Sequence, residues 1–154
     1  MIGGYKNLFK HKPSGKYLYG VTFEEIVAFY YFDEELRTLF LKYILHVERH
    51  LKSLISYHFC EKFGESQAEY LNPVNFNSAK KNQKAVNRLI HSMQNCISMP
   101  SHYNYISHYS KVYGNVPLWV AMNAVTFGQL SAFYQYMPND VQVKVSKHFR
   151  GYTE

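Results

Sequence analysis

The sequence has little cysteine, and neither of its two thiols belongs to a recognisable framework. Cys60 and Cys96 are too few for a disulfide scaffold and lack the CxxC spacing of a zinc site, so we expect two small buried hydrophobic residues. The first sixteen residues lack the apolar core of a signal peptide. The longest candidate for a membrane span, 112–137, is interrupted by Pro117 and Gly128 and is not expected to span a membrane. We therefore expect a soluble cytoplasmic protein that has no contact with a membrane.

Motifs for cofactors and metals are also missing. The sequence contains neither phosphate-binding glycine pattern, GxGxxG or GxxxxGK[ST], and no nucleophile elbow, so nothing indicates nucleotide use or acyl transfer. His46 and His50 have the four-residue spacing of a metal pair, but no acid completes a ligand set on that helix face. We expect a solvated surface there, no metal site and no cofactor.

Acidic residues are scarce in the second half of the chain. Residues 1–77 hold nine Lys/Arg and nine Asp/Glu, whereas residues 78–154 hold eight Lys/Arg and two Asp/Glu. The net charge of +6 therefore comes entirely from the second half. Such a distribution favours a polyanionic partner, and nucleic acid before membrane.

The remaining pattern is helical. Nothing alternates with period two for long enough to indicate a strand, and 154 residues correspond to one domain, 1–154. Residues 1–20 are expected to form a loop or hairpin. The fold class is then all-α, a bundle of about five to six helices with no significant sheet. We expect helices at residues 23–31, 33–63, 78–97, 101–113, 118–137 and 140–149.

Several boundaries and faces of these helices are specific. Thr22 and Glu25 form a capping box at the start of the first helix, and Gly64 ends the long helix, in which a kink is expected. Gly128 is a candidate break in the apolar helix that holds Trp119, a residue expected to be packed, and Asp140 is expected to cap the last helix. The long helix carries an apolar stripe of Leu36, Phe40, Ile44, Val47, Leu51, Leu54 and Ile55. The expected core face of the helix at 78–97 is Val86, Leu89, Ile90, Met93 and Ile97.

A basic stripe lies opposite that core face. It consists of Lys80, Lys84, Arg88 and His91, with Lys81 at its edge, and no acid occurs from residue 78 to residue 113. A charged stripe is commonly only the solvated face of a helix, but an unbalanced one is suited to tracking phosphates. Tyr105, like its neighbours Tyr103 and Tyr109, is either half-buried core or a platform for an unstacked base. The pattern predicts an RNA-binding surface.

Several segments together resemble the Abi-like (abortive infection) family of bacterial phage-defence proteins. The first is the Phe32–Arg37 segment FDEELR, and the second is VERHLKSLISYH at 47–58. The C-terminal ones are SHY at 107–109, VPLWV at 116–120 and TFGQLS at 126–131. The resemblance implies a role in phage defence and a further N-terminal helical segment that the sequence does not contain. It also implies an antitoxin or a phage-derived trigger as a partner.

The Abi-like family is in turn similar to the HEPN superfamily of helical, often ribonucleolytic domains, and that likeness implies a catalytic site. The HEPN signature is an Arg, four to six residues and a His; Lys52 and His58 match it here, with Lys in place of Arg. The implied catalytic residues are Lys52, His58, Arg49 and His108, in a site that the superfamily typically builds across a homodimer.

Helix geometry weighs against a simple pairing of these residues. Lys52 and His58 are six positions apart and point about 120° away from each other. His58 falls within the apolar stripe, so a hydrogen-bonded core His is the competing interpretation; His108 could equally make a structural hydrogen bond. Two functions therefore remain open. One is a metal-independent endoribonuclease, and the other is a non-catalytic RNA- or protein-binding regulatory module of a defence or toxin–antitoxin system.

Overall fold

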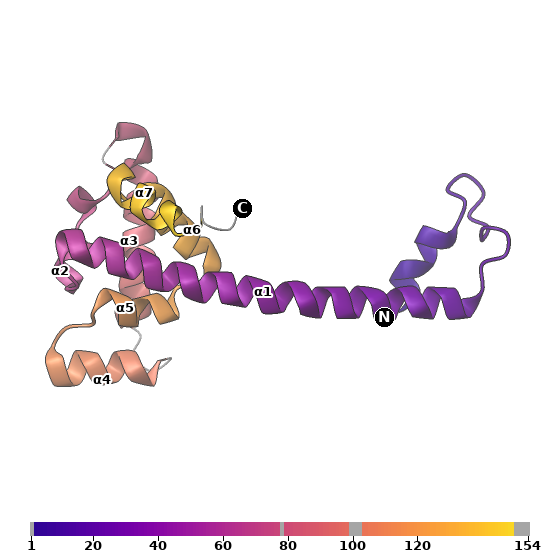
Figure 1. Ribbon diagram of the computed structural model, residues 1–154, viewed down its shortest axis with the longest axis horizontal. Helices are drawn as coiled ribbons and strands as arrows, with labels where there is room; N and C mark the ends of the chain where they lie inside the picture. The colour runs from indigo at the N-terminus through magenta and orange to yellow at the C-terminus, as the bar shows by residue number, and fades with distance from the viewer. Residues whose placement is uncertain (1, 78, 99–102, 150–154) are drawn as a thin grey trace. The chain divides into compact units, whose positions relative to one another are not determined.

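The protein is all-α in the computed structural model, which describes residues 2–77, 79–98 and 103–149 (Figure 1). The chain divides into two compact units, Met1–Val47 and Glu48–Glu154. No helix among the described residues combines the length and the apolar character needed to cross a membrane. The elements are η1 (Ile2–Phe9), α1 (Phe23–Phe63), α2 (Gln67–Tyr70), η2 (Pro73–Asn75), η3 (Lys80–Asn82), α3 (Gln83–Ser98), α4 (Asn104–Tyr113), α5 (Leu118–Ala121), η5 (Met122–Ala124), α6 (Phe127–Tyr136) and α7 (Asn139–Lys147).

The first unit begins with more helix than the sequence indicates. A 3-10 helix, η1, forms at Ile2–Phe9, so the expectation of a loop or hairpin is wrong for these residues. An isolated antiparallel bridge between Lys10 and Tyr17 makes a small hairpin in the segment that follows. The Tyr5 hydroxyl donates to Asp33 on α1 at 2.5 Å, and Arg37 donates to Tyr5 at 2.9 Å. Asp33 also pairs with Arg37 at 2.7 Å, so η1 is tied to α1 by a three-residue polar cluster.

α1 is one continuous helix of 41 residues, where two helices had been expected. The capping box at its start is confirmed: Glu25 N donates to Thr22 Oγ1 and Thr22 N donates to a Glu25 carboxylate oxygen. Asp33 does not start a new helix, because its carboxylate is occupied by Tyr5 and Arg37. The helix ends at Gly64, whose φ of 95° is open to glycine at little cost.

The apolar stripe of α1 is buried only at its C-terminal end. Ile55 is fully buried in the second unit, and Leu51 and Leu54 pack against the same core. Phe40 is 60% exposed, and Ile44 and Val47 are also exposed. The stripe indicates the helix correctly, and Phe40, Ile44 and Val47 form an exposed apolar part of it.

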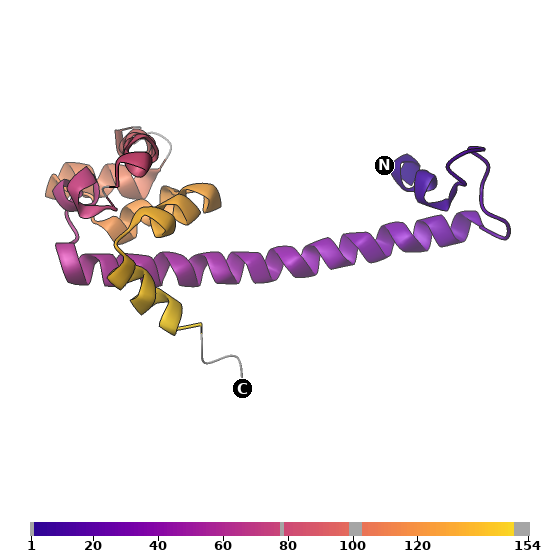
Figure 2. The ribbon, with the colours of Figure 1, turned by 90° about the horizontal axis from the view of Figure 1, so that it is seen from above.

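The second unit packs its helices around residues 48–63 of α1. Figures 1 and 2 both show α5, α6 and α7 beside this part of α1. Phe59, Phe76 and Phe133 meet at its centre, with ring centroids 5.1–5.6 Å apart. All five residues of the core face predicted for α3 are buried, which confirms that face.

The expected helix at 118–137 is three elements, α5, η5 and α6. The break lies before Thr126, where a complete capping box with Gln129 starts α6, and not at Gly128. Trp119 is 49% exposed, so the expectation that it is packed is wrong. Leu118, Val120 and Ala121 occupy the buried positions of the short helix α5 and leave Trp119 outward. Asp140 lies in the first turn of α7 and not at its N-cap, which is Pro138.

Candidate functional site

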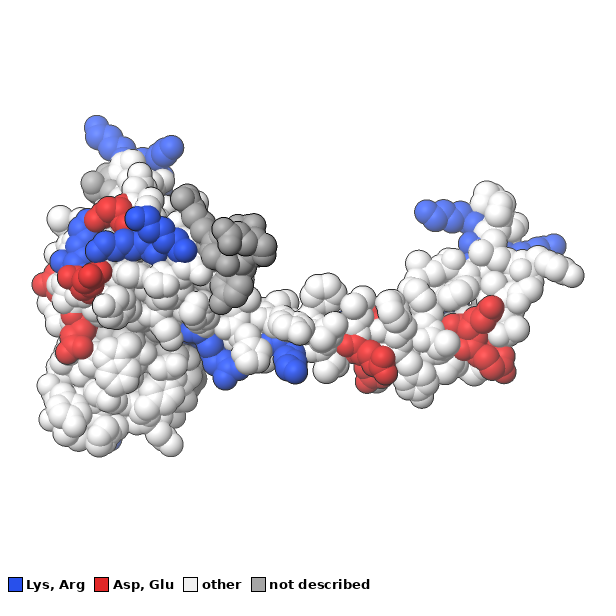
Figure 3. All heavy atoms as spheres, viewed as in Figure 1, with Lys and Arg blue, Asp and Glu red and all other residues white. Residues whose placement is uncertain are grey.

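The basic stripe lies on the exposed side of η3 and α3. Lys80, Lys81, Lys84, Arg88 and His91 are all exposed. No ion pair neutralises the four cations among the residues that the structure describes; Arg88 Nε donates only to the Lys84 carbonyl, at 3.4 Å. Ser78, expected to cap this helix, lies outside the described residues. Figure 3 shows basic side chains gathered around η3, whereas the surface over α4 and α5 is largely uncharged on this face.

His58 occupies a partly enclosed position on α1. Its neighbours Ile55 and Phe59 are fully buried, and His58 itself is 9% exposed. Its Nδ1 lies 3.3 Å from Glu61 Oε2, one turn further along the helix. Its Nε2 lies 3.1 Å from Nε2 of His148, the C-cap residue of α7. His58 therefore joins a carboxylate on α1 to an exposed imidazole on α7.

Two ion pairs fix α7 beside this histidine pair. Lys144 Nζ lies 2.9 Å from Glu61 Oε2, and Lys62 Nζ lies 2.6 Å from Asp140 Oδ2. The hydrogen bond from Lys144, and then that from His58, lower the pKa of Glu61 below its ordinary value. The hydrogen bond from Lys62 lowers the pKa of Asp140 in the same way. Both carboxylates are therefore ionised near neutral pH, and each holds a cation of the partner helix.

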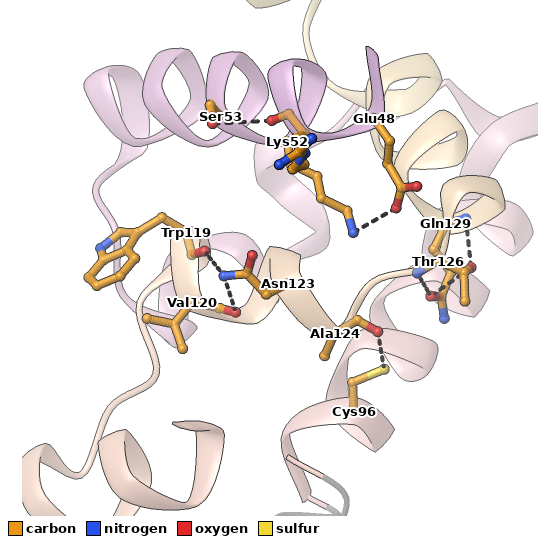
Figure 4. A network of polar contacts seen from close by, with 11 residues as sticks. Glu48, Lys52, Ser53, Cys96, Trp119, Val120, Asn123, Ala124, Thr126 and Gln129 are labelled. Carbon is orange, nitrogen blue, oxygen red and sulfur yellow. Dashed lines mark hydrogen bonds and ion pairs between the residues drawn. The ribbon is translucent and has the colours of Figure 1, made fainter. Parts of the chain in front are cut away.

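Lys52 is engaged elsewhere. Its ammonium pairs with Glu48, one turn earlier on α1, at 2.8 Å, and the Lys52 side chain is only 16% exposed (Figure 4). Arg49 is exposed, and its carbonyl accepts a hydrogen bond from Ser53. Lys52 and His58 therefore have separate polar partners, as expected from the angle between them on the helix.

His108 and the neighbouring tyrosines belong to α4. The His108 ring is exposed and lies edge-on to Tyr109 and Tyr113, at 5.9 and 6.2 Å. Tyr105 is exposed, and partial burial raises its pKa. Tyr109 also lies edge-on to Trp119, at 5.5 Å. These rings form an aromatic surface that is separate in sequence from the basic stripe.

The sequence analysis missed His148. It is 90 residues from His58 along the chain, and only the docking of α7 on α1 brings the two rings together. The one local signal is its position at the end of a short helix, where a cation complements the helix dipole. Of the four expected catalytic residues, only His58 belongs to this cluster by a direct contact.

The described residues do not bring together a set of side chains that could bind a metal ion. No group of three or more His, Cys, Asp or Glu side chains within residues 2–77, 79–98 and 103–149 could hold a metal ion. His50 lies edge-on to Phe149, with ring centroids 5.6 Å apart.

Comparison with known protein families shows to which family the chain belongs. A family model described as Abi-like protein matches residues 1–153. The chain belongs to the Abi-like protein family. Membership points to abortive infection, a bacterial defence against phage. Searches of characterised proteins and of solved structures gave no significant match.

The segments that carry the resemblance have structural roles in this Abi-like protein. Asp33 and Arg37 of the first segment bind Tyr5. Thr126 and Gln129 form the capping box of α6 (Figure 4). The Gln129 amide also donates to Ser92 on α3. The Val116 carbonyl accepts a hydrogen bond from the buried Tyr70 hydroxyl at 2.7 Å. Within these segments, the His58 side chain also contacts the exposed imidazole of His148.

Proposed function

We propose that this Abi-like protein acts in abortive infection as a metal-independent endoribonuclease of the HEPN type. The observation that carries the proposal is the contact between His58 and His148, whose Nε2 atoms lie 3.1 Å apart, with Glu61 behind His58. Imidazoles exchange protons near neutral pH, so two of them can supply the acid and the base of one reaction.

RNA cleavage without a metal needs two proton transfers and one positive charge. The base removes the proton of a ribose 2′-hydroxyl, whose oxygen attacks the adjacent phosphorus. The bond from phosphorus to the 5′-oxygen breaks, and the acid protonates that leaving oxygen. A cation stabilises the charge that grows on the phosphate oxygens. The products are a 2′,3′-cyclic phosphate and a 5′-hydroxyl end.

The cluster offers a group for each role. His148 is exposed and therefore meets the substrate first, while Glu61 orients His58 and stabilises its imidazolium form. In the free chain the two Nε2 atoms are hydrogen-bonded to each other, so RNA binding has to break this hydrogen bond. Lys144 is paired with Glu61, but its side chain is 47% exposed, unlike that of Lys52, so it can turn from Glu61 to an incoming phosphate and compensate its charge. We expect Lys52 and Arg49 to reach the site of a second copy in a homodimer, with His108 as a substrate contact.

The basic stripe supports RNA as the substrate. Its cations are exposed and lack acidic partners among the described residues, so they can bind consecutive phosphates. The exposed Tyr105 is suited to stacking on an unpaired base.

A second function is favoured by one observation. Lys52, which stands where the HEPN signature has Arg, is neutralised by Glu48 and largely covered. A cation in that state does not stabilise a phosphate, and this arrangement fits a non-catalytic RNA- or protein-binding regulator of a defence system. An antitoxin or a phage-derived trigger would then act through binding alone.

RNA cleavage in the presence of EDTA separates the two functions. The nuclease proposal expects the purified chain to cut RNA with EDTA present, and His58→Ala and His148→Ala to abolish cutting. The matched control is His50→Ala, an imidazole on the same helix whose contact is with Phe149. Intact RNA after long incubation with wild type, together with retained RNA binding, would select the regulator.

A further inference from the structure

A groove separates the C-terminal part of α1 from α5 in the second unit. It has a volume of about 580 Å³ and is open to solvent. Two aromatic rings line it: Tyr57 on α1, which is 66% exposed, and Trp119 on α5, which is 49% exposed. Figure 4 shows Ser53 on α1 facing the Trp119 side of α5. Large aromatic side chains left exposed beside a groove mark a binding surface rather than core packing.

Most polar atoms of this groove can accept a hydrogen bond, and the donors among its lining residues are the Tyr57 hydroxyl, the Cys60 thiol and the Trp119 indole N–H. Ser53 and Ser56 each donate their hydroxyl proton to the carbonyl four residues earlier, at 3.2 and 2.7 Å, which leaves only oxygen lone pairs. Glu61 receives both His58 and Lys144 on Oε2, which leaves its other oxygen for a further donor. Glu65 has no hydrogen bond or ion pair from its carboxylate among the residues described.

Cys60 also lines the groove and adds no positive charge to it. Burial raises the pKa of the Cys60 thiol to about 11, and the charge of Glu65 adds to that rise. Cys60 therefore stays a neutral thiol at physiological pH. The described residues that line the groove include no Lys or Arg. A carboxylate, lone pairs and two aromatic faces together attract a cation that can also donate several hydrogen bonds.

We propose that this groove binds an arginine side chain of a partner protein. A guanidinium is flat, so it can stack on the Tyr57 or Trp119 ring, and its fork of donors matches the carboxylate of Glu65. An ammonium satisfies the charge but not the stacking. RNA is disfavoured at the Glu65 end of the groove, because a phosphate would face a carboxylate that has no cationic partner among the described residues. Glu61 also belongs to the proposed cleavage site, so the inference rests on Glu65, Tyr57 and Trp119 and assigns their end of the groove to protein recognition.

Tryptophan fluorescence tests the proposal directly, because Trp119 is the only tryptophan in the chain. The probe is an acetylated, amidated Gly-Arg-Gly-Arg-Gly peptide, and its control is the same peptide with citrulline, which is isosteric and neutral. The arginine peptide should change the Trp119 emission saturably. The citrulline peptide should bind about tenfold more weakly, which corresponds to one charge-assisted hydrogen bond.

A matched pair of variants locates the effect. Glu65→Gln keeps the size of the side chain and the backbone carbonyl that accepts from Leu118, so the fold is retained, and it should weaken arginine binding about tenfold. Glu35→Gln, an exposed acid on α1 outside the groove, should leave binding unchanged. Equal responses to both peptides, no saturable response up to millimolar peptide, or an unchanged affinity in Glu65→Gln would overturn the proposal.

Discussion

His58 and His148 lie 90 positions apart in the chain, yet their Nε2 atoms are 3.1 Å apart. One ring is almost enclosed on α1, and the other is exposed at the end of α7. A hydrogen bond between two imidazoles requires one nitrogen to donate and the other to accept, so at least one ring is neutral. One nitrogen of the pair then donates a proton and the other accepts one, which are the two roles that an acid–base pair needs.

Alanine substitutions separate catalysis from structure at this pair. His58→Ala removes a buried group with two partners, and we expect a loss of cleavage together with a melting temperature lower by about 4–8 °C. His148→Ala removes an exposed ring, and we expect the same loss of cleavage with a shift of at most about 2 °C. Activity and circular dichroism melting are measured on the same samples. Full activity in folded His148→Ala would show that the pair is structural.

Lys52→Arg tests whether the cation of the HEPN-like spacing faces a phosphate. A guanidinium can bind phosphate through two parallel hydrogen bonds, so cleavage should rise if Lys52 contributes to the site. Single-turnover rates of wild type and variant are compared, with Lys42→Arg as the control on the same helix. An unchanged rate in Lys52→Arg would remove Lys52 from the proposed site and leave it as the partner of Glu48.

Charge reversal of the basic stripe should weaken RNA binding and flatten its salt dependence. Each phosphate contact that is lost removes about one unit from the slope of log affinity against log salt concentration. Replacing Lys80, Lys84 and Arg88 by Glu should therefore lower the slope by about three units, measured by fluorescence anisotropy. Lys6→Glu, Lys10→Glu and Lys12→Glu together give the matched control in the first unit. A slope that stays at the wild-type value would exclude the stripe as the RNA surface.

The exposed apolar residues of α1 predict self-association. Leu39, Phe40 and Ile44 are exposed large hydrophobic residues on one helix, and soluble proteins commonly cover such patches with a partner. We expect a symmetric homodimer, with twice the 18.2 kDa mass of the chain in light scattering. Phe40→Glu with Ile44→Glu should give monomers, whereas Tyr19→Glu, an exposed aromatic outside α1, should not. Wild type that stays monomeric at tens of micromolar would contradict this prediction.

Acid should loosen the attachment of α7 to α1. The pKa values of Glu61 and Asp140 are lowered by their lysine partners, so both pairs stabilise the fold above the ordinary carboxyl range near pH 4. That stabilisation is lost as the pH falls through the lowered values. The melting temperature should therefore drop between about pH 5 and pH 3, modestly, because the pairs are exposed. The double variant Glu61→Gln with Asp140→Asn should have a lower melting temperature than wild type at pH 6, and its melting temperature should fall less steeply between about pH 5 and pH 3. The control double variant Glu34→Gln with Glu35→Gln should behave like wild type.

The sequence predicts those parts of the fold that depend on local patterns. The core face of α3 is right because five apolar residues at helical spacing meet a core that belongs to the same unit. The capping box at Thr22 is right because its two residues are only three positions apart, so the contact is local. The Thr-x-x-Gln pattern at Thr126 indicates the start of α6, but it lies inside an apolar run whose pattern is typical of one continuous helix.

Other features depend on contacts that spacing does not encode. The periodicity of Phe40 and Ile44 indicates one helix face but not what covers it, and both side chains are exposed. Trp119 is a large apolar residue in an apolar segment, which favours burial, but the short helix α5 leaves its side chain exposed. The pairing of His58 with His148 depends on how α7 docks, through Lys62–Asp140 and Lys144–Glu61.

The chemistry of the RNA ends is the most direct test of the central claim. The purified protein is incubated with a labelled single-stranded RNA in EDTA, and the new ends are identified by phosphatase and kinase treatment. Attack by the ribose 2′-hydroxyl predicts a 2′,3′-cyclic phosphate and a 5′-hydroxyl, with no cutting where a 2′-deoxynucleotide replaces the scissile ribose. Uncut RNA, or products with 5′-phosphate ends, would contradict a metal-independent ribonuclease built on His58 and His148.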